Sequence, residues 1–262
     1  ERFSVKSMLN ARLRIWFGDT RDCNVMTKSF FIFFAMFVSL LCMGELRVQT
    51  EALEAGVQAM GRGHYATALR AFRNLAKTGD AQAENNIGYL YERGLGVPQD
   101  YGMALKWYKL AASKALPEGE YNTGLLYHHG YGVAKNQSEA KKWFERSARK
   151  GFIDAEFMMG HMYQNGWGVK SDGNRALSWY KRAAKKGKIE AQFMTGYMFM
   201  SGEAGPEEAV KGYAWTEVSF LNGYEGAKEV LDYAELSMKD SQIKMGKALA
   251  KQCLVSKLKN CP

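Results

Sequence analysis

The sequence has few of the residues from which catalytic and metal sites are usually built. Its 262 residues include four cysteines and four histidines, and no two cysteines form a CxxC pair. No cysteine and histidine have the spacing of a zinc site, and Walker, Rossmann, HExxH and Ser–His–Asp patterns are absent from the sequence. We therefore expect a protein that is not an enzyme and that holds neither a metal nor a cofactor.

Proline is also scarce, with 4 residues against 27 glycines, so tight turns and not long proline-rich linkers should join the elements. The 47% of hydrophobic and 24% of charged residues are typical of a globular chain. A net charge of +9 is a mild excess that favours acidic partners or anionic surfaces. The clustered arginine and aromatic pattern of a nucleic-acid-binding protein is missing, which excludes nucleic acid as the expected partner.

No apolar run reaches the length of an ordinary membrane span. The longest, residues 30–43, has 14 residues broken only by Ser39, whereas a spanning helix needs about 20. Its length, with Lys28 just before it, is typical of a signal-peptide core. We assign residues 26–44 to a signal peptide or signal anchor, and residues 1–25 to an upstream segment outside the mature fold.

Two alternatives for this segment stay open. Residues 30–43 could remain uncleaved and anchor the protein, with the basic residues before them held in the cytoplasm. The run could also be a buried helix of a cytosolic protein. A cleaved signal peptide and an uncleaved anchor both place everything after residue 45 outside the cytoplasm. They predict a periplasmic or secreted protein, or one anchored in the inner membrane and facing the periplasm.

Cys253 and Cys261 lie close together near the end of the sequence. In one continuous helix, two residues eight positions apart are separated by about 12 Å along the axis. A disulfide requires Cα atoms within about 7 Å. The two cysteines can therefore pair only if the chain reverses between them, in an oxidising compartment.

A period of 36 residues runs through most of the chain. Glycines, tryptophans and aromatic positions recur at this step between residues 80 and 227, and chance does not place four of six tryptophans at one spacing. The recurring residues are Gly88, Gly124, Gly160 and Gly196; Gly94, Gly130, Gly166 and Gly202; Gly96, Gly132 and Gly168, followed by Ala204; and Trp107, Trp143, Trp179 and Trp215.

Each repeat predicts a first helix, which we call helix A. In the first copy it spans roughly residues 81–93, where Ala83, Ile87 and Leu90 follow one buried face. Gly88 sits in the middle of this helix, where glycine costs about 1 kcal/mol relative to alanine. Its recurrence in every copy therefore predicts that another helix approaches too closely for a side chain.

The glycine pair after helix A has two interpretations. Gly94 and Gly96 precede a second helix, helix B, which is an arrangement that can bind phosphate. The same pair in three copies favours a connecting turn instead, since a stack of repeats needs the same turn each time. Asp100 and its counterparts in the next two copies should cap helix B. We expect helix B to bury Trp107 and Tyr108.

Helix pairs of this kind bury their apolar faces only by stacking on one another. The predicted fold is all-α, a right-handed α-solenoid of stacked helix–turn–helix repeats. We assign residues 45–79 to a partial tetratricopeptide-like repeat, residues 80–227 to four full repeats and residues 228–262 to capping helices.

Three stretches resemble Sel-one-like repeats (SLR), which are relatives of the tetratricopeptide repeat. They read LYERGLGVPQDYGMALKWYKLAA, LYHHGYGVAKNQSEAKKWFERSARKG and MYQNGWGVKSDGNRALSWYKRAAKKG. The resemblance covers about residues 50–227. The fourth copy departs from it, with Ala204 in place of the second glycine and a proline at Pro206.

The resemblance implies a scaffold for protein–protein contacts. Bacterial members of the family often act in the cell envelope or in host interaction. Some cysteine-rich relatives are linked to binding or weak hydrolysis of β-lactams, but those carry a cysteine pair in each repeat, and this chain does not.

One face of each helix A points away from the predicted core. By analogy with tetratricopeptide arrays, it should line the concave side and bind a peptide. Asparagines near the start of this face could hold a peptide backbone, and methionines near its end form an adaptable surface. Its residues are Asn86, Tyr89 and Arg93; Asn122, Leu125 and His129; Met158, His161 and Asn165; and Met194, Tyr197 and Ser201.

Alternatives to this binding face also stay open. Met158 and Met194 could instead fill gaps between helices. His129 and His161 could hold a metal across stacked helices, whereas the adjacent His128 and His129 point about 100° apart on a helix and could not chelate together.

Helix B carries a series of basic residues. We expect them to form a solvated convex face, with contact to an anionic lipid or polymer as the alternative. They are Lys106, Lys109, Lys142, Arg146, Arg149, Lys181, Lys185 and Lys186.

Together these features predict an exported, non-enzymatic scaffold that binds an unknown protein or peptide through its concave face, in the bacterial envelope or in host interaction. The alternative is an envelope protein that binds a small ligand or weakly hydrolyses it, of the β-lactam or peptidoglycan type.

Overall fold

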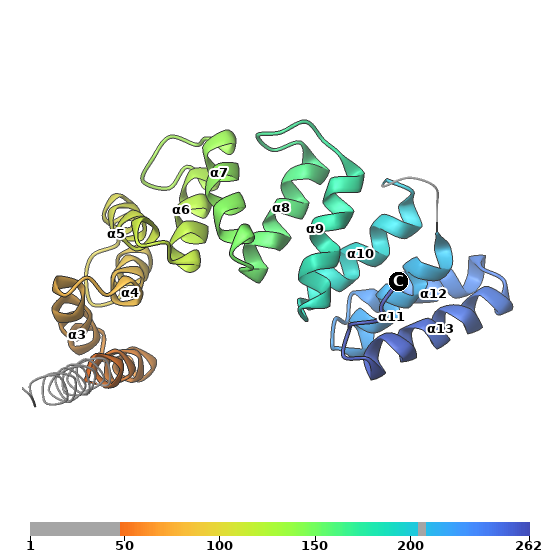
Figure 1. Cartoon of the computed structure of the whole chain (residues 1–262), viewed down its shortest axis with the longest axis horizontal. Coiled ribbons are helices and arrows are strands. Elements are labelled where there is room, and N and C mark those ends of the chain that lie inside the picture. The colour runs from red at the N-terminus through yellow and green to blue at the C-terminus, as the bar shows by residue number, and fades with distance from the viewer. Residues whose placement is uncertain (1–47, 204–207) are drawn as a thin grey trace, which may run out of the picture. The chain divides into compact units, whose positions relative to one another are not determined.

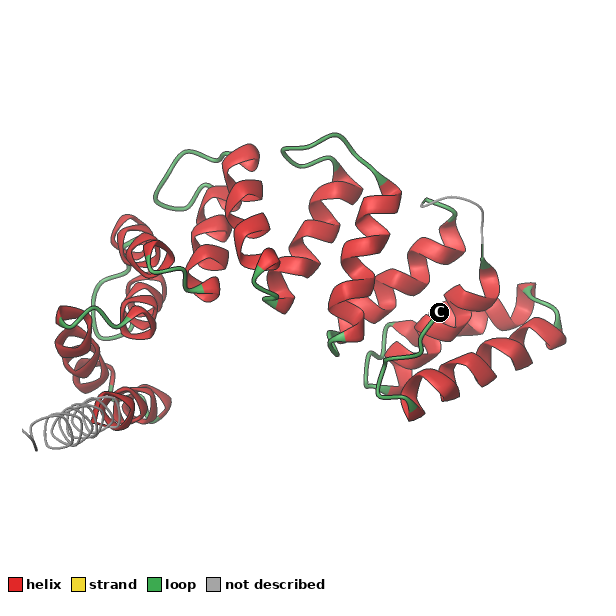
Figure 2. Cartoon of the chain, viewed as in Figure 1, coloured by secondary structure: helices red, strands yellow, loops and turns green. Residues whose placement is uncertain are grey.

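The computed structural model describes residues 48–203 and 208–262. The chain divides into two compact units, Glu1–Glu54 and Ala55–Pro262, and the account below concerns the second. The predicted upstream and signal segments, and Ala204 and Pro206 of the fourth copy, lie outside the described residues. Within the described ranges all regular structure is helical (Figure 2), and none of those helices is long and apolar enough to cross a membrane.

The helices follow one another through the four copies as the 36-residue period predicts, and each packs on the next in the sequence until the last helix, which packs instead on the third from the end (Figure 1). Residues 48–61 are helical and precede the first helix pair. The next helices are α3 (Tyr65–Lys77), α4 (Ala81–Arg93), α5 (Tyr101–Ser113), α6 (Pro117–His129), α7 (Gln137–Arg149), α8 (Ile153–Asn165), α9 (Gly173–Lys185), α10 (Ile189–Ser201), α11 (Ala209–Leu221), α12 (Ala227–Ser237) and α13 (Asp240–Val255).

In this series α4, α6, α8 and α10 are the A helices of copies one to four, and α5, α7, α9 and α11 are their B helices. The observed α4 has the bounds predicted from the sequence. The prediction of an all-α solenoid is confirmed.

The glycine in the middle of each helix A lies against a side chain of helix B, as predicted. A Cβ at Gly88 would come within 2.7 Å of the Tyr108 ring, and one at Gly124 within 2.7 Å of the Phe144 ring. Both rings are buried. The same relation holds in copies three and four, for Gly160 against Tyr180 and Gly196 against Thr216.

Replacing Gly124 by alanine is expected to lower the free energy of unfolding by about 1–3 kcal/mol, because the added methyl overpacks the site against Phe144. Gly61 is the matched control, since a Cβ there meets nothing within 4 Å and the glycine is helical. Gly61→Ala should stabilise the chain by up to about 1 kcal/mol through helix propensity. Urea denaturation followed by circular dichroism measures both changes. Equal effects of the two substitutions would contradict the close approach.

The glycine pair between helices A and B is a joint between repeats. Gly94 ends α4 in the left-handed conformation with φ of +68°, and Gly96 follows with φ of +71°. Gly132, the counterpart of Gly96 in the next copy, lies against the preceding repeat. A Cβ on Gly132 would lie 2.5 Å from the carbonyl carbon of Tyr101 in α5. The pair therefore turns the chain and sets the contact between repeats.

The start of helix B is fixed by two hydrogen bonds. The Asp100 carboxylate accepts from the amide of Met103 at 2.9 Å, which caps α5. The amide of Asp100 itself donates to the carbonyl of Tyr91 in α4 at 2.9 Å, which closes the loop. The caps of the next two copies follow the same pattern, with Asn136 accepting from Glu139 and Asp172 from Arg175.

The expected burial of the tryptophans is wrong in three of four copies. Trp215 is fully buried, but the other three are only half-buried. The guanidinium of Arg146 covers Trp143 at 4.6 Å from the ring centroid, and Arg182 covers Trp179 at 4.3 Å. A cation therefore covers the half-buried ring in copies two and three, and Trp179 packs on the core as well.

The C-terminal helices close the apolar end of the stack, and α13 packs on α11. Lys257 and Leu258 both have positive φ angles, of 50° and 65°, and so reverse the chain after α13. This reversal brings the Cα atoms of Cys253 and Cys261 to 4.6 Å, and the two form a disulfide. The indole N–H of Trp215 donates to the carbonyl of Pro262 at 3.0 Å, next to the disulfide.

Candidate functional site

Several basic residues near the end of helix B pair with a buried carboxylate, although their own side chains stay partly exposed. Glu156 in α8 is fully buried, and its Oε1 accepts from Arg182 at 2.7 Å and from Lys186 at 2.9 Å. Lys186 also donates to the carbonyl of Gly151 at 3.0 Å, which belongs to the end of the preceding repeat. These cations therefore neutralise a buried carboxylate and hold two repeats together.

The same pairing with a buried glutamate recurs in the first two copies. Six of the eight basic residues predicted for the solvated face are exposed, and two of these six, Arg146 and Lys186, also pair with a buried glutamate. The fourth copy replaces the charges by a neutral hydrogen bond from Asn222 to Gln192 at 2.8 Å. The sequence contains a signal for these ion pairs, because the glutamates and the lysines each recur at a step of 36 residues. The charged sets are Glu84 with Lys114, Glu120 with Arg146 and Lys150, and Glu156 with Arg182 and Lys186.

The residues of the predicted helix A face are all at least partly accessible. The exposed ones are Tyr89, Arg93, His129, Asn165, Tyr197 and Ser201, and the half-buried ones are Asn86, Asn122, Leu125, Met158, His161 and Met194. The middle of this face packs closely. Leu125, Met158 and Met194 lie against the central core, as the packing alternative predicted for the two methionines. Asn122 donates to Asn85 of the neighbouring helix A at 2.9 Å, which closes the space between α4 and α6.

The ends of the A helices carry a cluster of rings that the sequence analysis missed. Tyr131, between two loop glycines, stacks on His129 at 5.1 Å and on Tyr101 at 4.8 Å. Trp167, at the same position of the next copy, lies 4.9 Å from His128 and 6.4 Å from His161. The signal that could have found the cluster is the variable residue between the two glycines, which is aromatic in both copies.

Two histidines of this cluster have pKa values below the usual 6.5. Burial is the main cause for both, and the neighbouring charges of His129 and Lys135 lower the pKa of His128 further. The hydrogen bond between His128 and Gln137 acts in the opposite direction. Within the described ranges, no group of three or more His, Cys, Asp or Glu residues could hold a metal ion.

Stability should therefore decline in mild acid. Below about pH 6.5 the unfolded chain binds protons at His128 and His161 that the folded chain does not. The stabilisation is complete above that pH, and it is lost as the pH falls through the folded-state pKa values. In His128→Gln/His161→Gln the fall in unfolding free energy between pH 7.5 and 5.5 should be smaller than in the parent. Exposed His64→Gln is the control, and a parent-like slope in the double variant would contradict the assignment.

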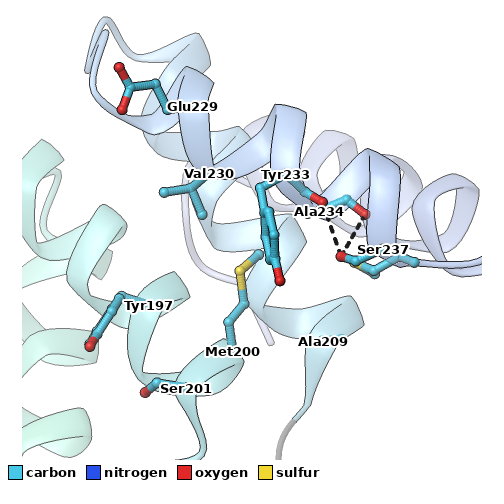
Figure 3. A pocket seen from close by; sticks show the side chains of 10 residues that line it. Tyr197, Met200, Ser201, Ala209, Glu229, Val230, Tyr233, Ala234 and Ser237 are labelled. Atoms are coloured by element: carbon cyan, nitrogen blue, oxygen red, sulfur yellow. Dashed lines mark hydrogen bonds between the residues drawn. The ribbon is translucent and has the colours of Figure 1, made fainter.

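An apolar groove lies at the C-terminal end of the helix A face. It has a volume of about 380 Å³, and α10 and α12 form its walls. Figure 3 shows Tyr197, Met200 and Ser201 on the α10 side and Val230 and Tyr233 on the α12 side.

The groove continues the predicted face by one more repeat. Val230, Tyr233 and Ser237 lie 36 residues after Met194, Tyr197 and Ser201, with the same spacing of three and then four. Tyr197 is 39% and Tyr233 is 72% exposed, so neither ring is needed to fill the core. The repeat pattern in the sequence ends this face at the fourth copy, because α12 lacks the loop glycines and the tryptophan that mark a full repeat.

The repeated helix pairs, their glycine joints and this open face define an α-solenoid of the tetratricopeptide type. The chain belongs to the Sel1 repeat family, which matches residues 81–116, 117–152, 153–188 and 189–224. Proteins of this family are generally scaffolds for protein interaction and are typically non-catalytic.

Solved structures with a similar fold come from several bacteria. A Sel1 repeat protein from Oxalobacter formigenes is 35% identical with a TM-score of 0.66, over 70% of this chain and 74% of that one. A protective antigen of uropathogenic Escherichia coli strains, which displays an SLR fold, is 25% identical with a TM-score of 0.46, over 76% of this chain and 50% of that one. No curated protein sequence matches the chain significantly.

Proposed function

We propose that the protein is an exported scaffold that binds a peptide segment of another protein along the helix A face. The observation that carries the proposal is the coincidence of the α10–α12 groove with that face. Equivalent residues of two successive repeats line the groove, and two exposed tyrosines flank it. Apolar grooves between helices with a few polar groups at the edge are typical peptide-binding sites.

The polar groups of the groove suit binding better than hydrolysis. The hydroxyl of Ser237 donates to the backbone carbonyl of Tyr233 at 3.0 Å. The hydroxyl of Ser201 accepts from the amide of Glu203 at 3.3 Å. Within residues 48–203 and 208–262, neither hydroxyl is hydrogen-bonded to a histidine or a carboxylate that could take its proton, as an activated serine nucleophile requires.

Two features support export. The apolar run of residues 30–43 has the length of a signal-peptide core, and disulfides such as Cys253–Cys261 persist mainly in oxidising compartments. In a bacterial host, the full chain should be found outside the cytoplasm with both thiols oxidised. A cytoplasmic protein with free thiols would contradict export.

Selection of displayed random peptides on the full chain tests the binding proposal. Peptides captured by the parent should be lost with Tyr197→Ala/Tyr233→Ala. They should be retained with Lys106→Ala/Leu110→Ala, which removes a matched exposed pair from helix B. Loss with the helix B pair and retention with the tyrosine pair would overturn the proposed face. Asn86→Ala/His129→Ala in parallel would show how far the bound peptide extends.

A further inference from the structure

The rim of the α10–α12 groove is acidic, although the chain as a whole is basic. Glu229 lines the groove from α12, and Glu203, which follows α10 but is not one of the lining residues, accepts a hydrogen bond from Gln164 of α8 at 3.0 Å. The Tyr197 hydroxyl is also hydrogen-bonded to Glu203, which raises the pKa of that tyrosine. Glu203 therefore lies directly beside the exposed tyrosine at the groove.

These two carboxylates are not neutralised by cations among the described residues. The basic residues nearest in sequence pair elsewhere, since Lys228 pairs with Asp232 at 2.9 Å and Lys211 pairs with Glu208. Glu235, which lies about 120° around α12 from Glu229 in helical register, pairs with Lys247 at 2.9 Å. The apolar groove thus has one carboxylate, Glu229, in its lining and a second, Glu203, beside its Tyr197, and neither has a salt bridge within residues 48–203 and 208–262.

We infer that this groove binds a basic amphipathic peptide segment, with apolar side chains between α10 and α12 and Lys or Arg side chains against Glu203 and Glu229. The inference rests on the proposed peptide-binding function and names its partner chemistry. Charge complementarity selects this occupant, because an acidic segment would place like charges against both carboxylates. An anionic lipid surface is disfavoured at this groove for the same reason.

The apolar part of the site fixes the character of the peptide. A volume of about 380 Å³ lined by Met200, Val230, Tyr197 and Tyr233 accommodates two or three apolar side chains at the most. The partner therefore needs apolar residues in a short cluster, with positive charges on both sides of it. The net charge of +9 suggests acidic partners for the molecule in general, and the groove is the local exception.

Fluorescence anisotropy with defined peptides tests the inference on the full chain. The probe is a labelled twelve-residue peptide with leucines at positions i, i+3 and i+4 and lysines around them. One comparison peptide replaces the lysines by glutamates, and another replaces the leucines by serines. The lysine–leucine peptide should bind most tightly, and Glu203→Gln/Glu229→Gln should weaken it about five- to tenfold. Tyr233→Ser should weaken it at least as much. At high salt the effect of the charge variant should shrink, whereas the effect of Tyr233→Ser should not.

The control variant removes two exposed carboxylates outside the groove, Glu190→Gln/Asp240→Asn, and should leave the affinity unchanged. Equal losses in the control and the groove variant would mean diffuse attraction to a cationic peptide and would overturn the inference. Tighter binding of the glutamate peptide would overturn it as well. If displayed peptides are captured through Tyr197 and Tyr233 but carry no basic residues, the inference fails while the proposed function stands. If no peptide depends on those tyrosines, both fail.

Discussion

Gly132→Ala is expected to lower the free energy of unfolding by about 2–5 kcal/mol. Two costs add at this position. An alanine in the left-handed conformation, at the observed φ of +65°, costs about 1–2 kcal/mol. Its Cβ would also lie 2.5–2.7 Å from backbone atoms of Tyr101 and Gly102 in α5, and backbone cannot move aside as a side chain can. Overpacking of this kind costs a further 1–3 kcal/mol or so.

Gly63→Ala separates the two costs. Gly63 also has a positive φ, of +77°, but a Cβ there meets nothing within 4 Å. Gly63→Ala should lower the free energy of unfolding by only about 1–2 kcal/mol. Because repeats are stabilised by contacts with their neighbours, Gly132→Ala should also broaden the urea transition or split it in two. Equal losses and equal cooperativity in the two variants would contradict the role of the glycine pair as a joint between repeats.

Removal of both cations around Glu156 should lower the free energy of unfolding about as much as Gly132→Ala does. Arg182→Met/Lys186→Met keeps apolar stems of comparable length but leaves a fully buried carboxylate without a counter-charge. Stranding one member of a buried ion pair costs about 3–5 kcal/mol. The methionine pair should therefore lower the unfolding free energy by about that amount in urea denaturation. It also removes the bond from Lys186 to the Gly151 carbonyl, which belongs to the same joint between repeats.

The fourth copy provides the matched rescue, because it holds Gln192 and Asn222 where the third holds Glu156 and Lys186, and Val218 in place of Arg182. Transferring that neutral set, Glu156→Gln/Arg182→Val/Lys186→Asn, should recover at least half of the lost stability. If the triple variant were less stable than the methionine pair, the cost would lie in side-chain packing and not in the stranded charge.

The fold was predictable because periodicity reports it directly. The step of 36 gave the helix pairs, Gly88 indicated the close approach that Tyr108 makes, and Asp100 marked the start of α5. Burial was less predictable. Trp143 recurs as regularly as a core residue, yet its shield is Arg146, and no periodic pattern distinguishes a ring under a helix from one under a guanidinium.

The candidate site was predictable in part. Spacing alone assigned Tyr197 to an open face, but the same rule assigned Met158 to it, which instead packs on the core. The difference depends on how far apart neighbouring helices lie, which spacing does not encode. The groove itself depends on Tyr233 in α12, a helix that keeps the face positions of a repeat after losing the glycines that identify one.

The central claim is that the helix A face, ending in the α10–α12 groove, is the binding surface of this Sel1 repeat protein. Hydrogen–deuterium exchange of the full chain, with and without a saturating peptide from the display selection, tests it most directly. Bound peptide should slow exchange in residues 189–201 and 227–237 and leave α5, α7 and α9 unchanged. Slowed exchange confined to those three B helices, with none in α10 or α12, would contradict the claim.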